Sequence, residues 1–269
     1  MPNPAAQRSG SRPHPHKAHP AKSLPAAPRP CCPAHSYGSL HQKDAAGGQS
    51  DVERDARAAA LETVGAWFAH RLTTTYVMSE LPAGWPRTPE AASFFPEGWL
   101  KDKGWPTFER AVSGMIKRRS ESSWRRIVDP AVPRGVKQGY RAPPMHPREF
   151  AGELARKVFG DGADCDVVAR LYADTFFGAL GEATDLDFND LDWSDADAEA
   201  FATVLPLLRR VERLDLGGND FGERGYEALG AAIREGAAPA LRKLEFGFKS
   251  ERIASAPLCE ACKARGIGY

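Results

Sequence analysis

Residues 214–225, with the sequence LDLGGNDFGERG, decide how the C-terminal half of this 269-residue chain is expected to fold. They open with an apolar–polar–apolar triplet. The same pattern stands 28 residues earlier, at 186–188, and 30 residues later, at 244–246. Such alternation is typical of a short strand, and each triplet runs on into a helical pattern. A period of 28 to 30 residues predicts strand–helix units that bury one face against the next unit.

The same stretch resembles the leucine-rich repeat of the ribonuclease-inhibitor type. Asn219 matches the family's Asn, which turns inward and satisfies loop carbonyls, and two glycines match the family's turn into the helix. The resemblance covers residues 184 to about 250. Leu191 stands in the Asn position of the first unit, so its turn must be built differently, and Lys249 stands there in the third. The family implies parallel strands on a concave face, helices on a convex face and protein binding, with no chemistry.

The expected fold class is therefore α/β: a short leucine-rich-repeat solenoid of about three parallel strand–helix units. A helical or small α+β region and a disordered N-terminus precede it. The expected divisions are a basic, Pro- and His-rich tail over 1–50, a Trp-rich helical region over 51–145, and a helical cap with the repeats over 146–269. The repeat positions expected to hold the structure together are Leu186, Phe188, Leu214, Leu216, Asn219, Leu244 and Phe246.

Alternation along each strand places charged residues on the concave side. The expected set is Asp185, Asp187, Arg213, Asp215, Lys243 and Glu245. Neighbouring strands lie ~4.8 Å apart, so Asp187, Asp215 and Glu245 are expected to form a ladder of like charges. Each neighbouring pair costs roughly 1 kcal/mol even in water, and Arg213 beside Asp185 offsets part of that cost. We hypothesise an acidic patch for a basic peptide or protein segment; the alternative is that Asp is simply a common solvated residue at this position.

The N-terminal fifty residues carry six basic residues and one acidic residue, whereas residues 151–269 carry 14 basic and 22 acidic ones. The tail is rich in Pro and shows no periodic apolar face, so we expect disorder. Its first 43 residues contain no acid, which leaves organelle import as an alternative. The compartment is otherwise cytoplasmic or unknown, and no run of 18 apolar residues predicts a membrane span.

In the remaining sequence, helices are expected over 51–71, 107–128, 146–159, 164–180 and 254–265, and a β-rich run over 73–78. Thr107–Val128 ends in a basic stretch that we assign to a solvated helix face rather than to nucleic acid. Asp164 is expected to cap its helix. Several Trp between 67 and 124 are assigned to packing of an irregular loop, since basic interleaving for a nucleic-acid platform is missing.

We find no motif that predicts catalysis, a cofactor or a metal. The acids between Asp185 and Glu199 do not match the spacing of a calcium-binding loop, whether the loop begins at Asp190 or at Asp185. Cys259 and Cys262 lack a second pair of ligands nearby. The sequence thus favours a non-enzymatic protein–protein interaction module whose partner is another protein, without nucleic acid. The alternative is a signalling or enzymatic α/β domain over 51–150 with the repeats as its regulatory sensor.

Overall fold

The computed structural model describes residues 48–77, 102–117, 127–129, 141–247 and 255–269. The tail expected over 1–50 lies almost wholly outside these residues. The loop tryptophans Trp85 and Trp99, as well as Trp124 and Lys249, also lie outside them.

Helix α1 (Asp51–Ala69) begins where the sequence supplies a capping box. The Glu53 amide donates to Ser50 Oγ at 3.3 Å, and the Ser50 amide donates to Glu53 Oε2 at 3.0 Å. This reciprocal pair satisfies amides that the first turn leaves without helical partners. Trp67 is 70% exposed, and Gly65 and Ala69 are the buried residues of the helix.

The helix expected over 107–128 is wrong at its C-terminal end. Helix α3 spans Gly104–Ser113 and is closed by Gly114. Strand β2 (Ile127–Val128) pairs in parallel with β1 (Thr75–Tyr76). The β-branched side chains favour the extended backbone once a partner strand is present, and that partner lies about fifty residues away in the sequence.

Lys117 is buried, which corrects its assignment to a solvated basic face. Its Nζ donates to the Phe68 carbonyl at 2.5 Å and to Thr75 Oγ1 at 2.8 Å. The hydroxyls of Thr75 and Ser113 lie 3.1 Å apart. One side chain therefore joins the last turn of α1 to β1, and a cation at a helix C-terminus also suits the helix dipole.

Helices α4 (Pro147–Leu154) and α5 (Asp164–Thr175) follow, and a π-helical turn, η2 (Phe176–Leu180), completes the second. We expected Asp164 to cap α5, but Asp164 is the first residue of the helix and Ala163 is the N-cap. Its carboxylate accepts a hydrogen bond of 3.0 Å from the indole nitrogen of Trp105 in α3. Tyr172 stacks on Phe150, with ring centroids 3.6 Å apart, which packs α5 against α4.

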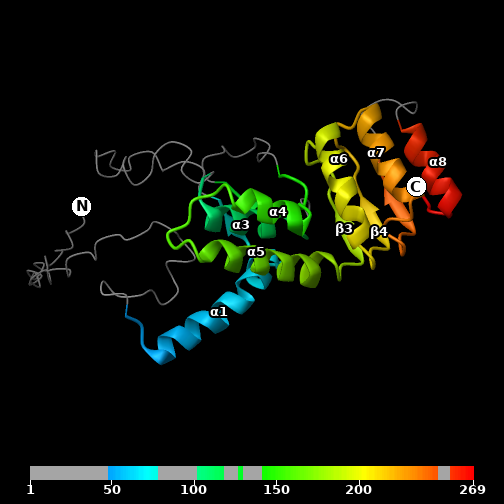
Figure 1. Cartoon of the computed structure of the whole chain (residues 1–269). Coiled ribbons are helices and arrows are strands. Elements are labelled where there is room, and N and C mark those ends of the chain that lie inside the picture. Colours follow the sequence, from blue (N-terminus) through cyan, green and yellow to red (C-terminus); the bar gives the residue numbers. More distant parts are fainter. Residues whose placement is uncertain (1–47, 78–101, 118–126, 130–140, 248–254) are drawn as a thin grey trace, which may run out of the picture. The chain divides into compact units, whose positions relative to one another are not determined.

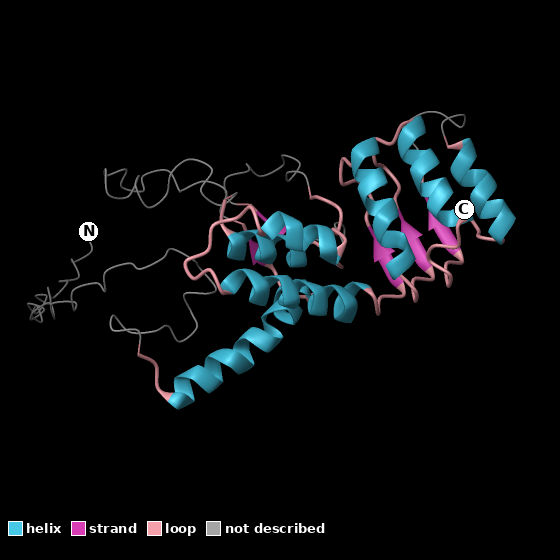
Figure 2. Ribbon diagram, in the orientation of Figure 1, coloured by secondary structure: helices cyan, strands magenta, loops and turns pink. Residues whose placement is uncertain are grey.

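The C-terminal part alternates strands and helices as the triplet period predicts. Strands β3 (Asp185–Asp187), β4 (Arg213–Asp215) and β5 (Lys243–Glu245) form one parallel sheet in the order β3-β4-β5. Helices α6 (Asp195–Val204), α7 (Glu223–Arg234) and α8 (Ala256–Arg265) lie along one face of this sheet (Figures 1 and 2), and a 3-10 turn, η3 (Leu205–Leu207), extends α6.

The inward row of the sheet packs as expected in its first two units. Leu186, Leu214 and Leu244 face one another in register and are at most 2% exposed. Phe188 is fully buried against Trp193, at 5.2 Å between ring centroids. Phe246, the equivalent residue of the third unit, is only partly buried and stacks on the half-exposed Tyr269.

Asn219 is buried between the turns of the first two units, as the family resemblance implies. Its Oδ1 accepts hydrogen bonds from the amides of Leu191 (3.0 Å) and Trp193 (3.2 Å). Its Nδ2 donates to the carbonyls of Phe188 (2.8 Å) and Leu216 (2.9 Å). One side chain thus satisfies four backbone groups, three of which belong to the neighbouring unit.

The first unit has no Asn in this position, and its turn is indeed built differently. Asp190 and Asp192 adopt positive φ angles of 51° and 58°, so the backbone bends around Leu191 without an inward amide side chain. Their strained conformation is sparsely populated by residues other than Gly. Asn219 of the second unit supplies the missing hydrogen bonds from outside the turn.

Helix α7 also depends on its neighbour for its start. Its N-cap residue is Gly222, which has no side chain to accept a hydrogen bond. Asp195 Oδ1, at the start of α6, accepts from the amides of Gly222 at 2.6 Å and Gly225 at 3.0 Å. A carboxylate at this end also suits the dipole of α7, so the first unit helps to order the second.

The outer edge of β3 faces two arginines rather than another strand. Arg71 donates to the Asp185 carbonyl at 3.1 Å, and the Arg141 guanidinium lies 3.5 Å from the Asp187 carbonyl. Arg141 also donates to the Lys117 carbonyl, and its own carbonyl accepts from the Trp193 indole at 2.7 Å. These contacts occupy acceptors that an open sheet edge would present to other chains.

Among the helices that the structure describes, none combines the length and the apolar character needed to cross a membrane.

Replacing Asn219 with Ala tests the link between the first two units. The change leaves two buried amides and two buried carbonyls without their partner, at about 1–3 kcal/mol for each group that water cannot reach. We expect a loss of at least about 4 kcal/mol in the free energy of unfolding, measured by urea titration with tryptophan fluorescence. Asn189→Ala is the matched control: its side chain makes one partly exposed bond, and its loss should cost less than about 1 kcal/mol. Equal effects would contradict this role of Asn219.

Gly65→Ala tests the close packing of α1 on α5. A Cβ at Gly65 would overlap the Thr175 hydroxyl and lie 3.0 Å from Thr175 Cβ. Overpacking of about 1–3 kcal/mol should exceed the gain of about 0.5–1 kcal/mol that Ala brings to a helix. We therefore expect a lower melting temperature. Gly152→Ala in α4, where a Cβ meets nothing within 4 Å, should raise it; a rise in both variants would show that this packing is loose.

Candidate binding face

The side of the sheet away from α6, α7 and α8 carries six charged side chains in two rows. We call it the polar face, and its members are those expected from the sequence: Asp185, Asp187, Arg213, Asp215, Lys243 and Glu245. Strand register places three of them in a first row and three in a second. Together with the backbone of the strands they line a shallow cavity of about 140 Å³.

The first row contains both cations of the face. It consists of Asp185, Arg213 and Lys243 in register. Arg213 Nε donates to Asp185 Oδ2 at 2.8 Å, and this hydrogen bond and the carboxylate charge raise the pKa of the guanidinium. Lys243 Nζ lies 2.6 Å from Glu245 Oε1 in the second row. Exposed pairs of this kind contribute roughly 0–1 kcal/mol to stability, so they can exchange partners at little cost.

The second row, which we call the acidic row, consists of Asp187, Asp215 and Glu245. Three carboxylates in adjacent positions of three parallel strands match the ladder that the alternation predicts. The Lys243 contact neutralises one end of this row, at Glu245. The six side chains of the polar face together carry four negative and two positive charges.

Two of these acids also have a structural task that the sequence analysis missed. Asp187 Oδ1 accepts from the Asn189 amide at 3.3 Å, and Asp215 Oδ1 accepts from the Gly217 amide at 2.8 Å. Each carboxylate thus closes a turn two residues after its own strand position. Asn189 Nδ2 additionally donates to Asp215 Oδ2 at 3.1 Å. The sequence contains a signal for this turn-closing role: Asp precedes a Gly- or Asn-containing turn in the first two units, and Glu replaces it in the third.

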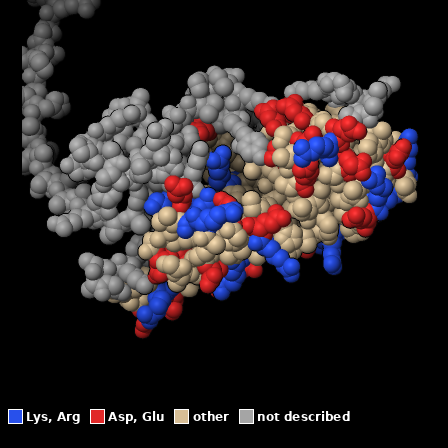
Figure 3. Space-filling model, turned by 45° about the horizontal axis from the view of Figure 1, so that its top comes forward, with Lys and Arg blue, Asp and Glu red and all other residues tan. Residues whose placement is uncertain are grey.

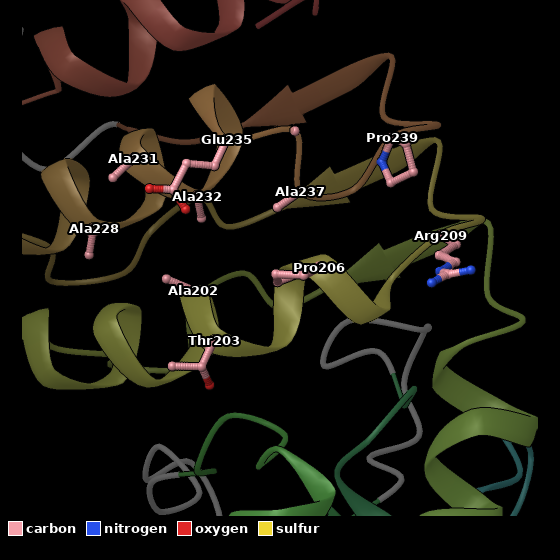
Figure 4. Close-up of a pocket in the computed structure, with 11 residues that line it drawn as sticks. Ala202, Thr203, Pro206, Arg209, Ala228, Ala231, Ala232, Glu235, Ala237 and Pro239 are labelled. Carbon is pink, nitrogen blue, oxygen red and sulfur yellow. The ribbon is translucent and has the colours of Figure 1, made fainter.

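A second cavity lies on the opposite side of the sheet, between α6 and α7, and measures about 500 Å³ (Figure 4). Alanines from both helices line much of it, and Arg209 and Glu235 are its charged residues. No pattern in the sequence predicted this cavity. Small side chains leave the two helices a gap that bulkier residues would have filled.

The other candidates from the sequence do not assemble into a site within the described residues. Cys262 is buried, and its burial raises the pKa of the thiol to about 11, so it remains protonated at neutral pH. Those residues contain no group of three His, Cys, Asp or Glu side chains placed to hold a metal ion. Trp105 is buried and hydrogen-bonded to Asp164 rather than exposed for stacking.

In the described part of 51–150, hydrogen bonds bring together one cluster of a base and two hydroxyls. It consists of Lys117, Thr75 and Ser113. Each of these side chains is at most 9% exposed. A substrate therefore has no access to them, and their bonds serve to hold α1, β1 and α3 together. Figure 3 shows basic and acidic side chains interspersed on the face in view, so that face offers no broad field of one sign.

Comparison with known proteins adds no relative: no family model, no curated protein and no solved structure matches this chain.

Proposed function

We propose that this protein is a non-catalytic protein-binding module whose polar face, the concave side of a short leucine-rich-repeat solenoid, receives its partner. The period of 28 to 30 residues, the parallel sheet and the inward Asn219 support the repeat assignment. Repeats of this kind stack so that each strand adds one rung to a continuous surface. The polar face is that surface, and its side chains are partly or fully exposed.

The observation that carries the proposal is the in-register acidic row. Like charges in adjacent rungs repel each other by roughly 1 kcal/mol per pair, and a bound cationic group would relieve that repulsion. The turn-closing role of Asp187 and Asp215 explains why Asp stands at two positions. It does not explain Glu245, whose side chain makes no such turn contact and pairs instead with Lys243. The proposed partner is a basic segment of another protein.

Charge reversal at Asp215 and Glu245 tests this proposal. The double variant Asp215→Lys/Glu245→Lys should lose at least tenfold in affinity for a Lys-rich peptide, measured by fluorescence anisotropy, because it replaces attraction with repulsion. The control variant Glu223→Lys/Glu235→Lys makes the same change in net charge on the helical side. It should lose less than twofold. If both double variants lose affinity equally, only net charge matters and the polar face is not the site.

A neutral variant separates charge from folding. Asp215→Asn removes the charge while its amide oxygen can still accept from the Gly217 amide. The partly exposed bond from Asn189 Nδ2 is lost, which should cost less than about 1 kcal/mol. We expect a melting temperature close to that of the parent chain and a three- to tenfold weaker peptide affinity. A large fall in melting temperature with unchanged affinity would mean that Asp215 serves the turn alone.

A further inference from the structure

Helix α8 carries two cysteines one turn apart, Cys259 and Cys262. Cys259 is partly exposed, whereas Cys262 is fully buried. The Cys259 thiol lies 4.0 Å from the Ser255 hydroxyl, which is a weak contact that leaves it free to move. Side chains of a helix lean back over the preceding turn, so the Cys262 side chain is directed toward Cys259. The two thiols are therefore neighbours on one face of α8.

The spacing of the two positions decides what kind of bond could join them. Residues i and i+3 of an α-helix have Cα atoms about 5 Å apart, within the roughly 4.4–6.8 Å that disulfides span. Their Cβ atoms lie about 5–6 Å apart, whereas a disulfide needs roughly 3.5–4.5 Å. A bond can thus form only if this turn of α8 tightens by about 1–2 Å. A disulfide under such strain is easily reduced again, as regulatory disulfides are.

We infer that Cys259 and Cys262 form a reversible, peroxide-sensitive thiol pair that closes to a disulfide within α8. The Cys259 thiolate attacks one oxygen of hydrogen peroxide, and the O–O bond breaks. Cys259 becomes a sulfenic acid, and the other oxygen leaves as hydroxide, which takes up the proton that the thiol gave up. The Cys262 sulfur then attacks the sulfenic sulfur, so the S–S bond forms and the S–O bond breaks. The departing hydroxide takes the Cys262 proton, so two thiols and one peroxide give a disulfide and two waters.

The burial of Cys262 sets the order of these steps. Burial, and after it the charge of Cys259, raises the pKa of the Cys262 thiol to about 11, so it is protonated at neutral pH. Because the thiolate is the reactive form, and because Cys262 is out of reach of solvent, the peroxide meets Cys259 first. Cys262 then reacts because it lies beside the oxidised sulfur, and this proximity compensates for its low intrinsic reactivity.

The tightened turn acts on the end of the sheet. The first turn of α8 has no room to move toward α7, because a Cβ at Gly230 would lie 2.9 Å from the Pro257 carbonyl oxygen. The tightening therefore displaces Cys262, whose carbonyl accepts a hydrogen bond of 2.9 Å from the Ile267 amide. The next residue, Gly268, bridges in parallel to β5 through two hydrogen bonds of 2.9 Å. Oxidation should therefore loosen the segment that covers the outer edge of β5.

Peptide mass spectrometry on the full chain tests this thiol pair, with Cys31→Ser and Cys32→Ser to exclude exchange with other adjacent thiols. Both cysteines of α8 fall in one tryptic peptide, residues 253–263, so the disulfide lowers its mass by two hydrogen atoms. After a small excess of hydrogen peroxide we expect this form to predominate, and dithiothreitol should restore both thiols. Hydrogen exchange of the Leu244 and Gly268 amides should be at least tenfold faster in the oxidised chain.

Variants separate the pair from single reactive thiols. Cys262→Ala should leave Cys259 as a sulfenic acid that dimedone traps, and Cys259→Ala should leave Cys262 at least tenfold less reactive than Cys259. The matched control Glu260→Cys/Cys262→Ala keeps two thiols in α8, but successive helix positions point apart, so its disulfide should form at least tenfold more slowly. Oxidation of Cys259 to sulfinic acid at the same rate with and without Cys262 would overturn the thiol pair. A disulfide that leaves exchange at Gly268 unchanged would overturn its effect on the sheet.

Discussion

The arrangement of the C-terminal sheet depends on the buried hydrogen bonds of Asn219. Tight turns after β3 and β4 bring backbone amides and carbonyls into the core, where unpaired polar groups are costly. The Asn219 side chain has two donors and two acceptor sites, and it uses all four on backbone groups. Because three of the four bonds reach into the first unit, that unit can keep Leu191 where the second unit has Asn219. The register of β3 against β4, and hence the alignment of the polar face, follows from this shared side chain.

In the proposed function, Asp serves both the structure of the turns and the binding of a partner on the polar face. Asp187 and Asp215 accept hydrogen bonds from the turns that follow their strands, which orients their carboxylates before any partner arrives. On the proposed function, these fixed carboxylates would lose little rotational freedom when a partner binds, which lowers the entropic cost of association. Glu245 lacks this constraint and pairs with Lys243, so the third rung is the adaptable part of the face. A face of this kind would recognise a pattern of charge rather than a single group.

The helical region before the sheet covers the outer edge of β3. Arg71 and Arg141 face the outward carbonyls of β3, and the Arg141 backbone receives the indole of Trp193. These contacts close one edge of the sheet and attach the first unit to the segment after α3 through the Lys117 carbonyl. The buried Lys117 ammonium then holds α1 and β1 to the same point. The apolar core runs without a break from Trp105 in α3 to the helices that cover the sheet, so the polar face rests on a packed support.

The sequence by itself determined the features that depend on short-range pattern. The period of the triplets predicted three parallel rungs, alternation predicted which side chains face solvent, and the match at Asn219 predicted its inward amide. What only the tertiary structure decided are contacts between distant segments: the strand at Ile127–Val128, the burial of Lys117, and the cap that Asp195 lends to α7. Periodicity describes a segment relative to its own axis, whereas these features depend on a partner segment that lies from 27 to 52 residues away in the sequence. Local propensity carries no information about that partner, and so Lys117 looked like one solvated base among several.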